Sequence, residues 1–500
     1  MSLLSRGEDE RSPALRVDTV RGRWVIAAAV LGSGVAFLDG TVVNAALPAI
    51  ARDFDADLAD LQWVLDGYLL TLSAFLVIGG SLGDLFGRRR MFLLGLVGFA
   101  AASLLCGIAP DVVSLIGARL LQGIAAALLV PGSLAIISAS FAPGDRGRAI
   151  GAWSGLAGIS TAAGPFLGGW LIDSVSWRLV FLINLPLVLV TVVITRRYVP
   201  ETRDETATRR VDLAGGGALA LALAGIVYGL IEGPAGNWPV SAVTVAVIGV
   251  LALVAFVVIE LRVEQPMVPL EVFRSRQFSG ANVVTFTVYA ALSSVLFLLV
   301  VHLQTDLDYS ALEAGAALMP ITVIMLLFSA RAGALAQRIG PRAPMTVGPF
   351  VIAGGLLLLT RVDPGTSYWS TVFPAAIVLG AGLALTVAPL TAAVLAAIDD
   401  HHAGIGSAIN NAVSRIAGLL AIAVLPAAAG LAGAGGRLDL VSGFARAMEI
   451  CAVLAVTGGV LAFVTIRRAK PVREMVHAVV TPPCGDPCLG EEDQGLRAAS

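Results

Sequence analysis

The chain has 500 residues, of which 57% are hydrophobic and only 14% are charged, and its formal net charge is −2. Soluble proteins carry about 25% charged residues, so this composition excludes an ordinary soluble enzyme and favours a membrane protein with many spans. The small net charge gives no general attraction to nucleic acid, and we expect no nucleic-acid partner.

Fourteen apolar runs are long enough to form spanning helices. A helix needs about 20 apolar residues to cross the roughly 30 Å hydrocarbon core of a bilayer. In chain order, the predicted spans are 24–44, 61–82, 91–109, 111–138, 149–172, 178–195, 211–231, 240–260, 279–303, 311–333, 343–360, 369–396, 405–431 and 441–466. The runs are continuous rather than alternating, which predicts helices and excludes the strands of a membrane barrel.

The distribution of arginine predicts the orientation in the membrane. Arginines gather before the first span and after spans two, four, six, eight and ten, whereas the opposite loops carry few. Because positively charged loops stay in the cytoplasm, we expect both termini to be cytoplasmic in a multi-pass protein of the inner or plasma membrane. The loop 399–402 contains no arginine, so the orientation of the last spans depends on the basic tail.

An internal repeat divides the chain into two halves. The segment GSLGDLFGRRR (80–90) closes span two and GALAQRIGPR (333–342) closes span ten, with Gln337 where Asp84 stands in the first copy. The repeated positions are Gly80, Gly83, Asp84, Gly87, Arg88 and Arg89 in the first half and Gly333, Arg338 and Gly340 in the second. Such repeats predict two related bundles with a path between them.

The spans and linkers predict seven segments. Two six-helix bundles, 24–195 and 279–466, flank an inserted helix pair, 211–260. The remaining segments are predicted to be cytoplasmic: an N-terminal segment (1–23), a linker (196–210), a loop (261–278) and a tail (467–500). The tail holds the single lysine, Lys470, and the pair Cys484 and Cys488.

Scarce residue types exclude bound nucleotides and metals. A P-loop needs lysine before serine or threonine, but Lys470 is followed by proline, so we expect no nucleotide. The four histidines show no metal-ligand spacing, and Cys484 and Cys488 lack a further pair of ligands. We therefore expect no metal and no cofactor.

Ionisable residues inside spans are the sharpest functional signal, because each costs about 2.5–3.5 kcal/mol on insertion scales. Counting from the span ends places Asp39, Asp66 and Arg119 in the outer half of the bilayer, where they could share one cavity. Gln122 lies on the same helix face as Arg119. Burial favours a neutral carboxyl group and a nearby guanidinium favours a charged one, so such a site can exchange a proton or accept a cation.

The sequence also predicts the contacts or positions of three further features. Asp84 and Arg88 are spaced i, i+4 for a breakable latch, which Gln337 cannot reproduce in the second half. Arg415, within span thirteen, is expected to pair across the bundle or to extend to the interface. His302, near the outer end of its span, is expected at the membrane interface.

Several of these motifs resemble the major facilitator superfamily, over most of residues 24–430. Segment 80–90 is similar to its loop signature, LDGTVVNAALP (38–48) to the first-helix signature of its fourteen-helix drug:proton antiporters (EmrB/QacA-like), and RLLQG (119–123) to its fourth-helix motif. The fifth-helix motif associated with antiport is matched by Gly155, Gly164, Pro165, Gly168 and Gly169. The resemblance implies an all-α major facilitator fold with two extra inserted helices.

These observations together predict a secondary transporter and not an enzyme. We expect it to export a small hydrophobic or cationic substrate across the lipid bilayer in exchange for protons, by alternating access of the two bundles. The resemblance of span five to the antiport motif implies exchange rather than uniport. A symporter or uniporter for a nutrient or metabolite is the alternative.

Overall fold

The computed structural model describes residues 15–203, 212–263, 266–398, 403–431 and 440–467. Lys470, Cys484 and Cys488 therefore lie outside the described residues, as do most of the two terminal segments. Within the described ranges the chain is helical, and the only β contact is an isolated bridge between Leu15 and Phe141.

The helices follow the predicted spans closely. The first half contains α1 (Val20–Phe54), α2 (Leu58–Phe86), α3 (Arg88–Gly107), α4 (Val112–Ser140), α5 (Pro143–Ser174), α6 (Leu179–Leu182) and α7 (Asn184–Tyr198). An intervening pair is formed by α8 (Leu213–Ala235) and α9 (Val240–Arg262). After a short 3-10 helix, η1 (Leu270–Arg274), the second half contains α10 (Arg276–Thr305), α11 (Ala311–Ala317), α12 (Met319–Ile339), α13 (Arg342–Leu359), α14 (Val372–Leu395), α15 (Ala403–Ala429) and α16 (Leu440–Thr465).

Thirteen helices in the described ranges are long and apolar enough to cross a membrane. Each of the fourteen predicted runs lies in a helix or in two consecutive helices, and the run at 149–172, in the 32-residue α5, is the one absent from the thirteen. The all-α prediction is therefore confirmed, while the count of fourteen spans stays a prediction.

Polar residues at the loop ends begin many of these helices. Asp57 and Asp60 form a reciprocal capping box at the start of α2, and Ser310 and Glu313 do the same for α11. Asp111 caps α4 by accepting a hydrogen bond from the Ser114 N–H. Such caps satisfy backbone donors that have no partner within the helix.

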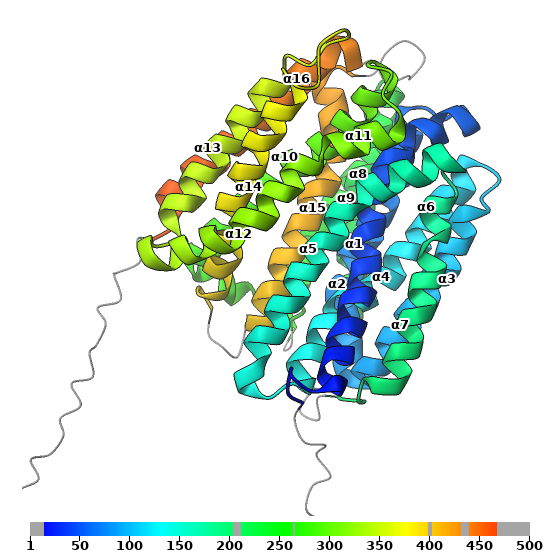
Figure 1. Cartoon of the computed structure of the whole chain (residues 1–500). Coiled ribbons are helices and arrows are strands. Elements are labelled where there is room, and N and C mark those ends of the chain that lie inside the picture. The colour runs from blue at the N-terminus through cyan, green and yellow to red at the C-terminus, as the bar shows by residue number, and fades with distance from the viewer. Residues whose placement is uncertain (1–14, 204–211, 264–265, 399–402, 432–439, 468–500) are drawn as a thin grey trace, which may run out of the picture.

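The helices pack as two bundles with the α8–α9 pair beside them. In Figure 1, α1 to α7 gather on one side, while α10, α12, α13, α14 and α16 gather on the other. In the first bundle α4 packs on α2 and α3, and α1 packs on α5; in the second, α13 packs on α14 and α16. Helix α8 packs on α9 and contacts α2 and α15.

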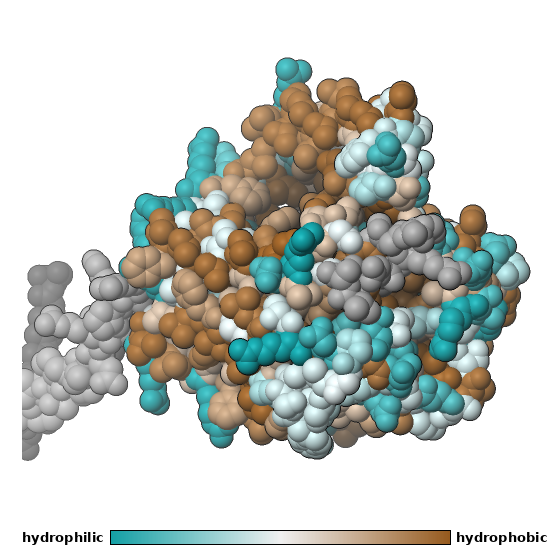
Figure 2. Space-filling view, turned by 90° about the horizontal axis from the view of Figure 1, so that it is seen from above, coloured by the Kyte–Doolittle hydropathy of each residue, from teal (hydrophilic) through white to brown (hydrophobic). Residues whose placement is uncertain are grey.

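The outer faces of the helices are apolar, as a bilayer requires. Helix α9 exposes a row of aliphatic side chains that includes Val247, Leu251 and Val254. Seen from above, hydrophobic side chains reach the periphery of the molecule beside hydrophilic ones (Figure 2). Exposed apolar surface of this extent is unfavourable in water and favourable in lipid.

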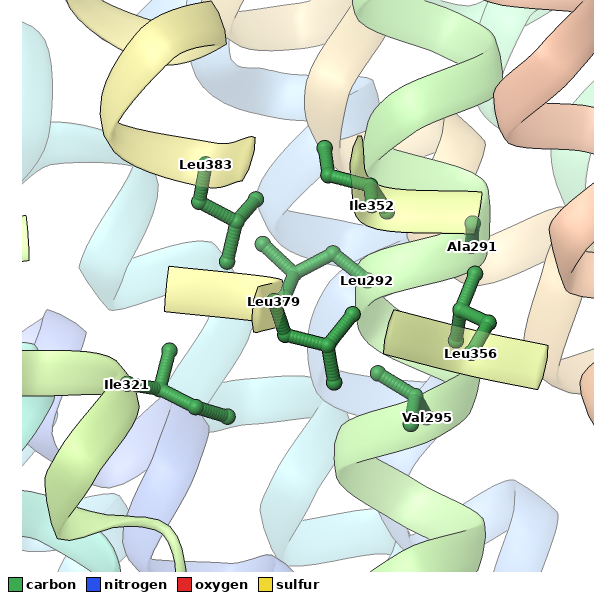
Figure 3. A pocket seen from close by; sticks show the side chains of 8 residues that line it. All are labelled: Ala291, Leu292, Val295, Ile321, Ile352, Leu356, Leu379 and Leu383. Carbon is green, nitrogen blue, oxygen red and sulfur yellow. The ribbon is translucent and has the colours of Figure 1, made fainter. Parts of the chain in front are cut away.

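The interior of the second bundle is aliphatic where α10, α13 and α14 meet. A cavity of ≈ 10 Å³ lies there, lined by Ala291, Leu292, Val295, Ile321, Ile352, Leu356, Leu379 and Leu383 (Figure 3). This volume is about that of one water molecule, and none of the lining side chains offers a polar partner.

Candidate functional site

Asp39 lies at the centre of a polar cluster within the first bundle. Its side chain is fully buried in α1, and its Oδ2 atom accepts a hydrogen bond from Arg119 Nη1 of α4 in a buried ion pair. The Oδ1 atom accepts from Gln122 Nε2 at 2.8 Å and from Asn184 Nδ2 at 3.0 Å. Three donors from two helices thus surround the Asp39 carboxyl group.

Arg119 is held by contacts that use several sides of its guanidinium. Its Nε donates to the Val64 carbonyl of α2 at 3.0 Å, and its Nη1 donates to Gln122 Oε1 at 2.6 Å. The Tyr68 ring lies 4.4 Å from the guanidinium carbon and Phe181 lies 5.7 Å away. A buried charge with an ionic partner, hydrogen bonds and aromatic faces is satisfied without water.

Two members of this cluster carry no signal in the sequence. Asn184 is the first residue of α7, and Ser103 of α3 accepts hydrogen bonds from Gln122 at 2.9 Å and from Asn184 at 3.3 Å. Neutral polar residues occur in many membrane helices, so hydropathy does not single them out. Charged residues within spans predicted Asp39 and Arg119, and the i, i+3 spacing from Arg119 added Gln122. Only the packing of the helices adds Ser103 and Asn184.

Asp66 stands apart from this cluster. It is fully buried in α2, and neither of its carboxyl oxygens has a hydrogen-bond partner among the described residues. The structure joins Asp39 to Arg119 by a hydrogen bond and shows no such contact to Asp66, and a cavity shared by the three residues stays a prediction. Counting residues predicts the depth of a side chain, whereas the direction in which it points depends on the rotation of the helix.

The loop between α2 and α3 contains the ion pair that the spacing predicted, while its role as a latch stays a prediction. Arg88 Nε donates to Asp84 Oδ1 at 2.8 Å, and Arg88 Nη2 lies 2.7 Å from the same oxygen. Gly87 has φ +104°, a backbone conformation that a side chain would strain. Glu201 accepts a hydrogen bond from the Arg89 backbone N–H at 3.1 Å, so the segment after α7 also holds this loop.

The second copy of the loop keeps the backbone and loses the latch. Gly340 has φ +87°, between α12 and α13, as Gly87 has between α2 and α3. Pro341 follows Gln337 by four residues, where Arg88 follows Asp84 in the first copy. Gly333 and Arg338 lie in α12, in the turns that lead to this glycine. The repeat therefore preserves the turn and not its charge pair.

The glycines of α5 allow close contacts with both bundles. A Cβ atom at Gly164 would collide with Thr41 and one at Gly168 with Val42, both on α1. At Gly169 it would collide with the Ala311 carbonyl of α11, in the other bundle. Gly80 and Gly83 have looser surroundings; Gly155 and Pro165 lie in the same α5 helix as the close-packed positions.

Hydrogen bonds between the bundles gather at one end of the molecule. The backbone N–H groups of Ala311 and Leu312 donate to Asp173 of α5 at 3.2 and 2.8 Å. Gln62 of α2 donates to the Ile422 carbonyl of α15 at 2.6 Å, and Gln304 of α10 donates to the Ala45 carbonyl of α1 at 3.1 Å. Sequence reasoning missed all three bridging side chains, because each lies near the end of a span, where polar residues are ordinary.

Two remaining predicted residues have definite places. Arg415 of α15 reaches across to α1, with its guanidinium carbon 5.2 Å from the centre of the Phe37 ring. His302 lies near the end of α10, is 1% exposed, contacts Asp306 at 2.7 Å and stacks on Phe444 at 4.2 Å, while its place at the membrane interface stays a prediction. The end of α10 is thus covered by α16, which hydropathy does not reveal.

Comparisons with known proteins identify the family. The profile of the Major Facilitator Superfamily matches residues 29–422. The chain is 35% identical, over 81% of its length and 76% of the relative, to the tetracenomycin C resistance and export protein of Streptomyces glaucescens. It is 36% identical, over 80% of each chain, to the puromycin resistance protein pur8 of Streptomyces alboniger. With the multidrug resistance protein Stp of Mycobacterium tuberculosis (strain CDC 1551 / Oshkosh), it shares 36% over 79% of its length and 73% of the relative.

Solved structures agree on the fold. A bacterial homologue of the human lysosomal transporter Spinster, in an inward-facing and unoccupied conformation, superimposes with a TM-score of 0.65 over 91% of this chain and 99% of that chain, at 17% identity. A D-xylose–proton symporter gives a TM-score of 0.64 over 90% and 99%, at 15% identity. The chain belongs to the Major Facilitator Superfamily: it has the fold of a multi-pass integral membrane transporter and is not an enzyme.

Proposed function

We propose that this transporter exports small hydrophobic or cationic molecules in exchange for protons. The direction is supported by the relatives that are named for resistance to tetracenomycin C, puromycin or several drugs and, in one case, for export. The exchange with protons is supported by one observation above all, the contrast between the two buried carboxyl groups, Asp39 and Asp66.

Asp39 and Asp66 have opposite surroundings. Asp39 accepts three hydrogen bonds and is paired with Arg119. Asp66 has no donor and no described ion-pair partner, and an ionised carboxylate in such a place costs several kcal/mol. We therefore assign the exchanged proton to Asp66, because no donor contacts it among the described residues, while Asp39 gives Arg119 a fixed charge partner. Two acids with unlike environments divide the roles of carrying a proton and of holding a charge.

The conformation fits one half of a transport cycle. The bridging groups Asp173, Gln62 and Gln304 close the end of the molecule away from the Asp84–Arg88 loop. With fourteen spans and both termini in the cytoplasm, as the arginine distribution favours, the closed end faces outward and the chain is inward-facing in the plasma membrane. The six-helix bundles 24–195 and 279–466 then rock about the contact of α5 with α11.

Loop and glycine residues would set the path of this motion. Asp84 and Arg88 form a local pair here, and breaking it would let Asp84 grip the other bundle when the inner side closes. Close packing at Gly168 and Gly169 would seal the outer side, so that a proton crosses only when substrate moves. Arg119 and Gln122 of α4 contact Asp39 of α1, so they would transmit a change in the charge or position of Asp39 to both helices.

Transport in proteoliposomes tests the proposal. We expect protein in vesicles with an acidic lumen to accumulate tetraphenylphosphonium, a lipophilic cation, and to lose the accumulation when a protonophore removes the gradient. Asp66→Asn should abolish gradient-driven uptake, while the exposed control Asp363→Asn should keep it. Uptake by Asp66→Asn equal to that of wild type would refute the role of Asp66. Accumulation driven by an acidic exterior instead would refute antiport and support a symporter.

A further inference from the structure

A basic cavity lies where the ends of three helices of the second bundle meet. It has a volume of ≈ 400 Å³ and lies between the first residues of α10 and α13 and the last of α16. Its lining is Arg276, Arg342, Val464, Thr465, Ile466 and Arg467. The cavity is far from the Asp39 cluster, which belongs to the first bundle, and nothing in the proposed transport cycle uses it.

Among the described residues, the three arginines of this cavity have no acidic partner. No carboxylate lines the cavity, and none of the three forms a salt bridge within the described residues. Arg276 Nη2 donates to the Val464 carbonyl at 3.2 Å, and the Arg342 guanidinium carbon lies 4.2 Å from the centre of the Phe463 ring. Arg342 Nε is buried, and no described residue forms a hydrogen bond with it. Converging, uncompensated positive charges with unused donors are the surroundings that an anion requires.

Two helix beginnings add to the positive field. Arg276 is the first residue of α10 and Arg342 the first of α13, so both helix N-termini face the cavity region. Ser275 caps α10, whereas no side chain caps α13, whose preceding residue is Pro341. The first N–H groups of a helix and its dipole favour negative charge, and phosphate above all.

The rim of the cavity is apolar and faces outward. Phe463 is 53% exposed and Val464 is 55% exposed, and Val460, one turn earlier on α16, is 48% exposed. This apolar strip adjoins a group of arginines at the ends of spanning helices, which is the boundary between hydrocarbon and headgroups. A soluble anion would use only the arginines, whereas a phospholipid would use the arginines and the strip.

We propose that this cavity binds the phosphate headgroup of an anionic phospholipid, with an acyl chain along Val460, Phe463 and Val464. Basic pockets between membrane helices recognise such headgroups through arginine and lysine. The orientation proposed above places the lipid in the cytoplasmic leaflet; the binding itself does not depend on that assignment. Bound lipid would join α10, α13 and α16 through one phosphate.

Lipid binding to the purified full-length chain tests this site. In mixed micelles we expect phosphatidylglycerol to bind more tightly than phosphatidylcholine and to raise the Tm, as native mass spectrometry and thermal unfolding would show. The triple variant Arg276→Gln/Arg342→Gln/Arg467→Gln should lose about fivefold in affinity per arginine removed, and phosphatidylcholine binding should not change. Arg361→Gln, an exposed arginine at the other end of α13, is the matched control.

A double variant distinguishes loss of lipid binding from loss of folding. Arg276→Gln/Arg467→Gln leaves Arg342 on Phe463, so the bundle should keep its lipid-free Tm and still lose about 25-fold in affinity for phosphatidylglycerol. Unchanged affinity in both multiple variants would overturn the site. Equal stabilisation of wild type by inorganic phosphate alone would overturn the lipid assignment and leave a site for a free anion.

Discussion

The two halves of this transporter share a backbone plan and differ in their buried chemistry. The first bundle buries the Asp39–Arg119 pair and the solitary Asp66. At the meeting of α10, α13 and α14, the second bundle holds only aliphatic side chains around a small cavity (Figure 3). Its polar contact between α10 and α15, Asn410 with Asn282 and Thr285, is uncharged.

The two copies of the loop, α2–α3 and α12–α13, also share their backbone conformation and differ in their charges. Gly87 and Gly340 both have positive φ, whereas the Asp84–Arg88 pair exists in the first copy only. Repetition therefore preserves what the chain path needs, whereas, among the described residues, the buried aspartate–arginine pair lies in the first half only. This contrast supports the proposal that the first bundle handles the proton and that the second serves as the surface against which it moves.

Removing Arg119 should have the largest effect on stability. Arg119→Gln leaves Asp39 buried without its charged partner, so we expect the free energy of unfolding to fall by about 3–5 kcal/mol, measured by denaturant titration in detergent. Asp39→Asn/Arg119→Gln should recover part of the loss because both charges are gone. A loss no greater than that of the exposed control Arg361→Gln would contradict the difference between the halves.

A core truncation in the second bundle should cost nearly as much stability and leave coupling intact. Leu379, which is 2% exposed, borders the aliphatic cavity, and Leu379→Ala should lower the free energy of unfolding by about 2–5 kcal/mol. The ratio of protons to substrate exchanged per folded molecule should equal that of wild type. A changed ratio, measured with pH-sensitive dye in proteoliposomes, would show that the second bundle also couples protons.

A substitution where the halves meet should have an intermediate effect. Gly169→Ala drives a methyl group into the Ala311 backbone, so the outer contact must open at a cost of about 1–3 kcal/mol. We expect a lower Tm and faster passive proton leak through vesicles. Gly117→Ala in α4 meets nothing within 4 Å and is the control. Equal leak from the two variants would argue against a seal at α5 and α11.

The smallest change in stability belongs to the loops. Asp84→Asn removes a half-buried i, i+4 pair, which is worth about 0.2–0.5 kcal/mol, yet we expect transport turnover to fall by about fivefold to tenfold, a typical conformational coupling. Gln337→Asp should alter neither quantity, because Pro341 stands where a partner would be needed. Faster turnover in Gln337→Asp would indicate that the second loop can form a latch after all.

Much of the fold follows from the sequence because the bilayer constrains it strongly. Every predicted span lies on a helix, and the costly charges in spans pointed to Asp39 and Arg119. The i, i+4 spacing of Asp84 and Arg88 was sufficient to predict their ion pair.

What hydropathy cannot supply is the rotation of each helix and the neutral partners that packing selects. Asp66 has no hydrogen bond to the Asp39 cluster among the described residues, and Asn184 looks like any polar residue at a helix start. Asp173 gains its role only because α11 begins beside it, a contact between segments that are 138 residues apart.

Substrate-induced proton release by the purified protein tests the division of roles most directly. In weakly buffered detergent solution, tetraphenylphosphonium should release protons from wild type and from Leu379→Ala, and it should release none from Asp66→Asn. Asp66→Asn should still bind the cation, as equilibrium dialysis would show. A loss of proton release would then mean that the exchanged proton is missing and not that the substrate no longer binds. Undiminished release from Asp66→Asn would place the proton elsewhere and contradict the assignment of proton handling to this carboxyl group.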